Sequence, residues 1–545
     1  MQGLMQNWPL RVSSIIDHAA RYHGGREIVT RSLEGPIHRY TYTDLRRRAK
    51  RFASASSQLD LRPGDRVGTL AWNTYRHLET WYGLMGAGLV CHTLNPRLFR
   101  DQLAYIARHA RDRYLLLDVG FVELAEELQD ACPEIRGFVL LTDRAHMPAT
   151  RLRGAVCYEE LVEAGDPDFE WVPVDENAAA GLCYTSGTTG NPKGVAYSHR
   201  SNVLHALAVN GGDALGLRCT DSVLPVVPLY HANAWALAFS APMAGAKLVL
   251  PGDRLDGQSL YELIEAEQVD FTAAVPTVWL ALLEYLERER LRLSSLRRVV
   301  IGGSAVPQVM LEKFERDYGV EVVHGWGMTE MSPLGTLATL KPELLDAEPE
   351  ERLRTKLKQG RPIFSVDMKI VDDAGKELPW DGESFGHLWV RGPGVVDSYL
   401  GGEGGRILDD EGFFHTGDVA TIDAQGYMHI TDRSKDVIKS GGEWISSIEL
   451  ENAAVGHPDV AEAAVIGVAH AKWDERPLLI AVPREGRSPD PRDLLDFLRG
   501  KVAKWWLPDA VVFVDEIPHT ATGKIQKQAL RERFEEFRLP EDSGD

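Results

Sequence analysis

Three observations predict an α/β fold with a large N-terminal domain of layered α/β subdomains, a small β-rich subdomain and an α+β C-terminal domain. The 545 residues are too many for one ordinary core and favour several packing units. Short apolar runs alternate with amphipathic stretches over much of the chain, which is the rhythm of a parallel sheet covered by helices. After the charged stretch at residues 342–360, the runs shorten and turn residues separate them.

The alternation begins at about Arg66 and can be followed element by element. Strand-like "RVGTLAW" precedes the helical pattern "TYRHLETWYGLMGAG", and strand-like "LVCHTLN" precedes helical "DQLAYIARHARD" and the apolar run "YLLLD". The same order returns in "SLYELIEAEQVDFTAAVP", "VWLALLEYLERERL", "RRVVIGG" and "VMLEKFERDYGVEVVHGWG". The chain shows no fixed-period internal repeat and no low-complexity tract.

The later part of the chain predicts two smaller units. The segments "VDMKIVDDAGKELP", "FGHLWVRGPG" and "GYMHITD" are typical of short strands joined by turns. Beyond them, helices are expected at "SSIELENAAVG" and "PRDLLDFLRGKVAKW", and strands at "AAVIGVA", "LLIAVP" and "AVVFVDEIP". We therefore place a boundary near Asp432, with an N-terminal domain at residues 1–432 and a C-terminal domain at residues 433–545.

Charge and cysteine content exclude some classes of function. Sixty basic against eighty acidic residues give a formal charge of -20, and no long basic run relieves it, so nucleic acid is not expected as a partner. Any anionic ligand must be bound by local groups. The five cysteines form no C-x-x-C pair, and this pattern favours a reduced, cytoplasmic compartment.

One apolar run resembles a membrane span in length. Residues 222–246 carry no charge, but three prolines interrupt the run, and His231 and Asn233 lie inside it. We expect a buried strand, turn and helix there and no transmembrane segment. The first residues lack the basic and apolar regions of a signal peptide, so none is expected.

The stretch "YTSGTTGNPKG", residues 184–194, combines three glycines, four Ser or Thr residues and Lys193. It lies between strand-like runs and is expected to be a loop. Glycines allow close backbone approach, and backbone N–H and hydroxyl groups bind phosphate oxygens, so the stretch predicts a nucleotide site. It is not the G-x-x-x-x-G-K-[ST] P-loop, because no glycine precedes Lys193 and no Ser or Thr follows it. A Gly-rich turn that merely connects two strands is the alternative.

This stretch resembles the phosphate-binding signature of the adenylate-forming enzymes, which include acyl-CoA synthetases, luciferases and the adenylation domains of peptide synthetases. Further motifs follow in the family's order: "PLYHANAW", "HGWGMTE", "TGD", "DRSKDVIKSGGEWIS" and "PHTATGKIQK". The resemblance covers nearly the whole chain and is particularly close to bacterial medium- and long-chain fatty acyl-CoA synthetases and methylmercaptopropionate-CoA ligases. It implies ATP, Mg²⁺ and coenzyme A as cofactor and co-substrates, and a homodimer.

The resemblance also implies roles for individual residues. Lys524, Glu330 and His231 are expected to be catalytic, and Thr185 and Glu330 to bind the metal ion. A solvated surface lysine and a Glu that starts a helix are the alternatives for Lys524 and Glu330. Contacts to ATP or AMP are expected from Thr185, Ser186, Gly187, Thr188, Thr189, Gly190, Lys193, Gly303, Ser304, Gly325, Trp326, Gly327, Met328, Thr329, Asp418 and Arg433.

Two further groups of residues are implied by the same resemblance. The acyl pocket is expected to include His231, Trp235, Gly325 and Pro333. Because amino-acid-activating relatives have an aspartate where this chain has His231, an amino-acid substrate is disfavoured. The C-terminal domain is expected to be mobile about a hinge at Asp432 and Lys435, and coenzyme A is expected to meet the loop of Lys439, Ser440, Gly441, Gly442, Glu443 and Trp444.

The sequence therefore predicts an ATP-dependent carboxylic acid–CoA ligase that acts on a medium- or long-chain fatty acid. A ligase for a short thioether acid such as methylmercaptopropionate, or for an aryl acid, is the nearest alternative. A protein that binds nucleotide without turnover is a second class. A P-loop kinase or NTPase is a third, and it predicts ADP rather than AMP as the product.

Overall fold

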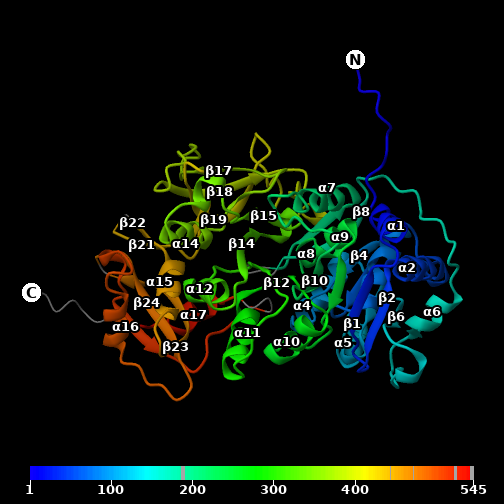
Figure 1. Cartoon of the computed structure of the whole chain (residues 1–545), viewed down its shortest axis with the longest axis horizontal. Helices are drawn as coiled ribbons and strands as arrows, with labels where there is room; N and C mark the ends of the chain where they lie inside the picture. The colour runs from blue at the N-terminus through cyan, green and yellow to red at the C-terminus, as the bar shows by residue number, and fades with distance from the viewer. Residues whose placement is uncertain (186–190, 442, 471, 521–523, 540–545) are drawn as a thin grey trace, which may run out of the picture.

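The structure is a computed structural model of the whole chain, and it describes residues 1–185, 191–441, 443–470, 472–520 and 524–539. Two large sheets, a four-stranded sheet and a five-stranded sheet make up its framework (Figure 1). The expected α/β class, with layered α/β units, a β-rich unit and a final α+β unit, is confirmed.

The first large sheet has nine strands in the order β16-β15-β14-β13-β12-β10-β11-β1-β2. Its centre is parallel, while the β1/β2, β14/β15 and β15/β16 pairs are antiparallel. The strands are β1 (Glu27–Arg31), β2 (Ile37–Thr41), β10 (Ser222–Pro225), β11 (Lys247–Leu250), β12 (Phe271–Ala274), β13 (Arg298–Ile301), β14 (Glu321–Gly327), β15 (Leu334–Leu337) and β16 (Arg361–Pro362).

The second large sheet has seven strands in the order β7-β6-β5-β3-β4-β8-β9, and all pairs except β8/β9 are parallel. The strands are β3 (Arg66–Leu70), β4 (Val90–Thr93), β5 (Tyr114–Leu117), β6 (Gly137–Leu140), β7 (Val156–Cys157), β8 (Ala179–Tyr184) and β9 (Gly194–Ser198).

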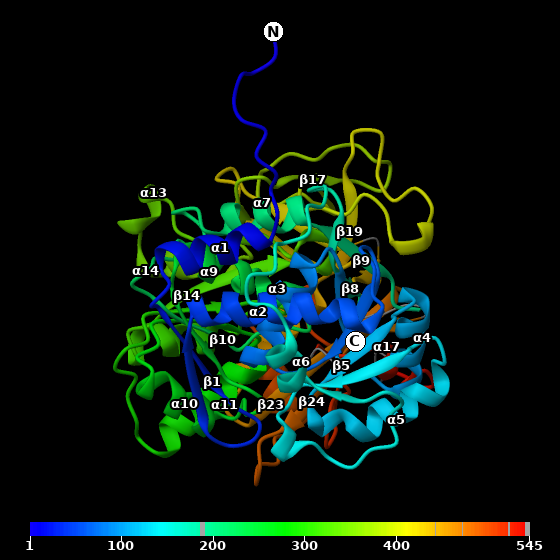
Figure 2. The same cartoon turned by 90° about the vertical axis from the view of Figure 1, so that its right-hand side faces the viewer.

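Helices between the two large sheets form a shared apolar core, in which the largest buried side chains include Trp81, Tyr82 and Phe239. The helices of this middle layer are α1 (Ser13–Tyr22), α2 (Tyr42–Ser56), α3 (Tyr75–Gly86), α7 (His199–Val209) and α9 (Leu237–Ala244). Outer helices cover the remaining faces. The outer face of the seven-stranded sheet is covered by α4 (Arg100–Ala110) and α5 (Val122–Ala131) (Figure 2). The outer face of the nine-stranded sheet is covered by α10 (Gly257–Ala266), α11 (Pro276–Arg288) and α12 (Gln308–Glu312). Two β-sheets covered on both faces are thus packed through one helical layer.

Shorter helices fill the connections: α6 (Tyr158–Ala164), α8 (Ala232–Trp235), α13 (Pro342–Leu345) and α14 (Pro349–Leu357). The uncharged run at residues 222–246 forms β10, α8 and α9, as expected from its prolines. None of the helices in the described residues has the length and apolar character needed to cross a bilayer.

The β-rich unit is an antiparallel sheet in the order β17 (Asp367–Val371), β18 (Phe385–Arg391), β19 (Phe414–Ile422) and β20 (Met428–Arg433). Its apolar core also includes side chains from β8, β9 and β14. The last unit has the order β22-β21-β24-β23 with β25 beside β24. Its elements are β21 (Ile438–Ser440), β22 (Glu443–Ile445), α15 (Ser447–Val455), β23 (Val460–His470), β24 (Asp474–Pro483), α16 (Pro491–Leu498), β25 (Ala510–Phe513) and α17 (Lys527–Arg533). Its two faces bury separate apolar clusters.

Candidate active site

A central cavity of about 430 Å³ lies where strands of both large sheets end. Its walls come from the segments after the carboxyl ends of β4, β8, β10, β12, β13 and β14. Ligands of open α/β sheets bind at such strand ends. The cavity brings together many of the predicted site residues: Thr185, Lys193, His231, Trp235, Gly303, Gly325, Trp326, Gly327, Met328, Thr329, Glu330, Pro333, Arg433 and Lys524.

The two ends of the glycine-rich stretch are fastened to each other. The Thr185 N–H donates to the Lys193 carbonyl at 2.9 Å, and the Lys193 N–H donates to Thr185 Oγ1 at 3.1 Å. The stretch joins β8 to β9, which pair antiparallel, as a loop between strands was expected to do. The predicted contacts at Ser186, Gly187, Thr188, Thr189 and Gly190 lie outside the described residues. The Lys193 ammonium lies 4.7 Å from the centroid of the Tyr399 ring, beside the cavity.

Glu330 is a buried carboxylate held from several sides. The Tyr399 hydroxyl donates to Glu330 Oε1 at 2.8 Å, and the Val396 N–H donates to the Glu330 carbonyl at 2.7 Å. Tyr197 on β9 donates to the Thr329 carbonyl at 2.7 Å and fixes the same segment. Burial raises the pKa of Glu330, and the hydrogen bond from Tyr399 opposes that shift. A nearby cation would therefore stabilise its charged form.

Trp326, Asp418 and Arg433 form a linked group in which Trp326 and Arg433 line the central cavity, while the predicted site residue Asp418 is buried and lines neither cavity. The Trp326 Nε1–H donates to Asp418 Oδ2 at 3.0 Å, and Arg433 Nε lies 3.0 Å from Asp418 Oδ1. Trp326 ends β14, while Asp418 and Arg433 face each other in the β19/β20 pair, so the group joins two sheets. Since a carboxylate has about four acceptor positions, Asp418 retains capacity for a ligand hydroxyl.

Lys524 lies in the central cavity beside charged groups from other units. Desolvation, with a smaller contribution from the Arg433 guanidinium, lowers the pKa of Lys524 to about 8, while Asp418 and Glu330 oppose the shift. Two hydrogen bonds join Lys524 to Thr520: the Thr520 N–H donates to the Lys524 carbonyl at 2.7 Å, and the Lys524 N–H donates to Thr520 Oγ1 at 3.2 Å. A lysine with a lowered pKa in a cavity is a candidate for chemistry.

The backbone around Trp235 is left-handed. Residues from Ala232 to Ala236 have φ values between +42° and +68°, a conformation that costs about 1–2 kcal/mol for each residue with a side chain. The expected turn is present, but the residue pattern did not predict that its backbone would be left-handed. The turn places Trp235 against Gly302, where a Cβ atom would lie 3.2 Å from the indole Cη2 and 2.7 Å from the Gly325 carbonyl oxygen. Only glycine leaves room for the indole here.

His231 precedes this turn and faces the same cavity. Desolvation, with a smaller contribution from the Lys524 cation, lowers the pKa of His231 to about 4. The imidazole is therefore neutral at pH 7, where it accepts or donates a hydrogen bond but carries no charge.

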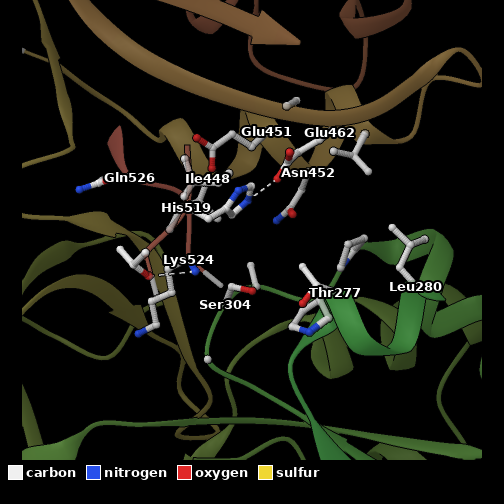
Figure 3. A pocket seen from close by; sticks show the side chains of 18 of the residues that line it. Thr277, Leu280, Ser304, Ile448, Glu451, Asn452, Glu462, His519, Lys524 and Gln526 are labelled. Carbon is white, nitrogen blue, oxygen red and sulfur yellow. Dashed lines mark hydrogen bonds and ion pairs between the residues drawn. The ribbon is translucent and has the colours of Figure 1, made fainter. Parts of the chain in front are cut away.

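A second, larger cavity of about 780 Å³ adjoins the first and shares Arg97, Thr277, Gly303, Arg433 and Lys524 with it. Figure 3 shows that α11, with Thr277 and Leu280, faces α15 and β23, with Asn452 and Glu462, across this space. Lys524 belongs to the segment between β25 and α17, and it lines the same space. His519 Nε2 lies 2.5 Å from Glu462 Oε1, so the segment that carries Lys524 is also tied to β23.

Several predicted residues lie outside the central cavity. Ser304, Asp432 and Lys435 line the second cavity instead. The predicted coenzyme A residues Lys439, Ser440 and Gly441 line neither cavity. Gly442 lies outside the described residues, and of Glu443 and Trp444 the structure gives only the backbone of β22. The two groups of residues expected to serve successive chemical steps are therefore separated in space.

Sequence reasoning missed other residues that line the central cavity. Asn95 and Arg97 directly follow β4, and Tyr399 follows the β18 strand by several residues. A polar pair after a predicted parallel strand was the available signal for Asn95 and Arg97. Tyr399 had no local signal, because its importance depends on contacts with Lys193 and Glu330 that are remote in sequence.

Comparison with protein families identifies the chain. The AMP-binding enzyme family matches residues 16–400, and the AMP-binding enzyme C-terminal domain matches residues 449–524. The chain belongs to the AMP-binding enzyme family. Within this family it is 52% identical over 538 residues to the 3-methylmercaptopropionyl-CoA ligase of Ruegeria lacuscaerulensis, covering 98% of this chain and 99% of that one.

Other members of the family are similar over the same length. The medium-chain-fatty-acid–CoA ligase of Ectopseudomonas oleovorans is 48% identical over the whole of both chains, and the long-chain-fatty-acid–CoA ligase of Thermus thermophilus is 46% identical over 98% of this chain and 97% of that one. Among solved structures, the anthranilate CoA ligase AuaEII in complex with anthranoyl-AMP superimposes with a TM-score of 0.85 at 26% identity, covering 97% of this chain and 99% of the other. The family resemblance drawn from the motifs is thus confirmed.

Proposed function

We propose that the chain is an AMP-forming carboxylic acid–CoA ligase that uses ATP and acts on a medium- or long-chain fatty acid. The observation that carries the proposal is the composition of the central cavity. Its lining combines the charged side chains of Lys193, Glu330, Arg433 and Lys524 with apolar side chains that include Trp235. Such a cavity accommodates a charged triphosphate and an aliphatic acid in contact with each other.

In the first half-reaction, a carboxylate oxygen of the acid forms a bond to the α-phosphorus of ATP while the bond to the pyrophosphate oxygen breaks. The acid is already ionised near pH 7, so the step needs positioning and charge stabilisation more than a base. Lys524 supplies a positive charge beside both reactants, Trp326 offers a surface for the adenine, and Asp418 accepts from the ribose hydroxyls. Lys193 and the ends of its loop bind the departing pyrophosphate.

The residues present also fit a magnesium ion. Glu330 offers a buried carboxylate and Thr185 a hydroxyl in the same cavity, and both are the hard oxygen ligands that Mg²⁺ prefers. The described residues contain no group of three or more His, Cys, Asp and Glu side chains around one point, so ATP phosphates and water would complete the shell. When bound, the ion neutralises phosphate charge and orients the pyrophosphate.

In the second half-reaction, the sulfur of coenzyme A forms a bond to the acyl carbonyl carbon, the bond from that carbon to the phosphate oxygen breaks, AMP leaves with the electron pair, and the thiol proton passes to solvent. We assign the loop at residues 439–444 to this step. Because Lys439, Ser440 and Gly441 line neither cavity while Lys524 lines the central one, we propose that the C-terminal domain rotates about Asp432 and Lys435 between the steps.

A short thioether acid is the second candidate substrate. The 52% identity to a 3-methylmercaptopropionyl-CoA ligase favours it. The deciding experiment offers acids of increasing chain length, together with methylmercaptopropionate, and measures coenzyme A-dependent release of AMP and pyrophosphate. ADP as the product, or no product with any acid, would overturn the proposed function.

Replacing Trp235 should change the preferred acid. In Trp235→Ala the indole no longer covers Gly302, so longer acids gain apolar contact, at about 0.8 kcal/mol or roughly fourfold in kcat/KM for each additional buried methylene. The chain-length series measures this shift. Trp380→Ala is the matched control, because Trp380 is 40% exposed in the β17–β18 connection and should leave the optimum unchanged. An unchanged optimum in Trp235→Ala would remove Trp235 from the acyl pocket.

The rate of adenylation should fall as the pH rises through the pKa of Lys524, which is about 8. The cation exists below that pKa and is lost above it, so the decline lies on the alkaline side. In Lys524→Arg the guanidinium stays charged, and the alkaline decline should disappear even though the rate is lower. Acid-dependent ATP–pyrophosphate exchange between pH 6 and 10 tests this. A decline that persists in Lys524→Arg would assign it to another group.

We also propose a domain boundary, a cellular compartment and an oligomeric state. The domain boundary lies between Asp432 and Arg433, next to the end of β20. The five cysteines, four of which are buried, are free thiols and support a reduced cytoplasmic compartment. A homodimer is proposed from resemblance to bacterial fatty acyl-CoA synthetases, and light scattering would measure the mass.

A further inference from the structure

The segment "KWDERPLL" takes no part in either cavity, yet it contains the most heavily bonded arginine of the last unit. Arg476, on β24, has a side chain that is 8% exposed. Its guanidinium donates to four different groups around it: the Trp505 carbonyl at 2.8 Å, the Leu507 carbonyl at 3.1 Å, Asp509 Oδ1 at 2.7 Å and Ser440 Oγ at 3.3 Å. The planar guanidinium has five N–H donors and can reach all four groups at once, whereas the compact ammonium of a lysine, with three donors, would not.

The acceptors of Arg476 belong to two separate segments, β21 and the connection between α16 and β25. Ser440 ends β21, Trp505 and Leu507 lie in the connection after α16, and Asp509 precedes β25. Pairing between β21 and β24 is limited to the single register Ser440 with Asp474. β21 also pairs with β22 at three registers, so it is the contact of this hairpin with β24 that depends largely on side-chain bonds.

Neighbouring bonds fix the same tip. The Gly441 N–H donates to the Trp473 carbonyl at 2.9 Å, and the Lys439 N–H donates to Glu475 Oε2 at 2.9 Å. Gly441 has φ of +62°, and a Cβ atom there would lie 2.9 Å from Trp473 and 3.6 Å from Trp505. Trp505 in turn lies beneath Arg476, 4.6 Å from its guanidinium carbon to the ring centroid. These contacts hold the backbone at residues 439–441 in one conformation. Arg476 contributes through its bond to Ser440 and its contact with Trp505.

We propose that Arg476 is a positioning residue for the thioester-forming half-reaction, holding Ser440 and Gly441 in the conformation that receives the coenzyme A thiol. The proposal rests on the proposed function, because it assigns residues 439–444 to coenzyme A. Arg476 touches neither reactant. It acts through Ser440 Oγ and through the carbonyl groups that place Trp505 behind Gly441. Adenylation, which takes place at the central cavity, does not require this support.

The test measures the two half-reactions separately in the full-length protein. In Arg476→Met, transfer of the acyl group from preformed acyl-adenylate to coenzyme A should fall on the order of 10²-fold, the size of effect that a displacement of about 1 Å produces. Acid-dependent ATP–pyrophosphate exchange should stay within about twofold of the wild type, as expected for a site that the change does not reach. Arg487→Met is the matched control, because Arg487 is exposed and pairs with Asp459 at 3.4 Å, and neither half-reaction should change.

Asp509→Ala provides a milder variant that keeps the arginine. It removes one partner and leaves the bonds to Trp505, Leu507 and Ser440, so the loss in acyl transfer should be smaller than in Arg476→Met. Equal losses in both half-reactions, or unchanged acyl transfer in Arg476→Met, would overturn the proposal.

Hydrogen exchange gives a readout that does not depend on turnover. In Arg476→Met the amides of Lys439 and Gly441 should exchange at least about tenfold faster, while the ladder between β23 and β24 keeps its protection. Unchanged exchange at Lys439 and Gly441 would show that Arg476 does not hold the loop, whatever acid the enzyme uses. Absence of acid-dependent exchange of pyrophosphate in the wild type would instead count against the proposed function.

Discussion

Replacing Lys524 with methionine should lower the rate of acid-dependent ATP–pyrophosphate exchange by on the order of 10²–10³-fold, the loss typical of removing one preorganised charge-stabilising group. Lys524 lies in the central cavity with Glu330 and Arg433, where burial strengthens its field on the developing charge of the α-phosphate. Methionine retains much of the length and apolar stem of lysine, so the cavity should keep its shape.

The second half-reaction separates a chemical role for Lys524 from a structural one. Transfer from preformed acyl-adenylate to coenzyme A should stay within several-fold of the wild type in Lys524→Met, because rotation of the C-terminal domain takes Lys524 away from the acyl group. Lys501→Met serves as the control, since Lys501 is an exposed lysine of the same unit, 4.4 Å from the Phe497 ring centroid. If both half-reactions fall together in Lys524→Met, the lysine supports the structure of the domain instead.

The sequence predicted much of the framework because the features involved are local. Apolar runs alternate with amphipathic runs wherever a parallel strand is followed by a covering helix, and β3, β4 and β5 with α3 and α4 appear where the pattern placed them. The loop between β8 and β9 was likewise predicted from the strand-like runs on either side of it. In both cases the pattern of neighbouring residues determines where the strands lie.

The left-handed turn from Ala232 to Ala236 was not predictable in this way. Alanine and tryptophan rarely adopt positive φ, and although asparagine tolerates it, no glycine marks the turn. The conformation is held by packing around it: Trp235 lies against Gly302, and Asn233 Nδ2 donates to Asn202 Oδ1 at 3.2 Å. Tertiary contacts therefore determine this part of the candidate acyl pocket, and such contacts cannot be predicted from the local sequence pattern.

Contacts across long sequence separations were also hidden. The motifs indicated Trp326 and Asp418 separately, but the hydrogen bond between them joins residues 92 positions apart. The same holds for Tyr399, which contacts Glu330 and Lys193 yet belongs to no motif that the sequence offered. Residue types and spacing identified which side chains carry chemistry, whereas the fold was needed to show which of them position the others.

Replacing Asp418 with alanine should raise the KM for ATP by about 10- to 150-fold, because hydrogen bonds to a charged group contribute about 1.5–3 kcal/mol. The carboxylate binds Trp326 Nε1–H and Arg433 and still has acceptor positions for ribose hydroxyls. Its removal also leaves the N–H of a tryptophan that is 8% exposed without a partner, at a cost of about 1–3 kcal/mol in the free energy of unfolding. Steady-state kinetics and urea denaturation measure the two effects.

Asp418→Asn should separate these effects, since the amide oxygen still accepts from Trp326 while the negative charge toward Arg433 and the ribose is lost. We expect stability close to that of the wild type together with a raised KM for ATP. Asp367→Ala is the matched control from the same sheet, because Asp367 and Arg391 form a pair at 2.8 Å with side chains 55% and 46% exposed, and such exposed pairs contribute about 0–1 kcal/mol. An unchanged KM in both Asp418 variants would mean that the carboxylate only orders Trp326 and Arg433, and the ribose would then require other acceptors along the cavity wall.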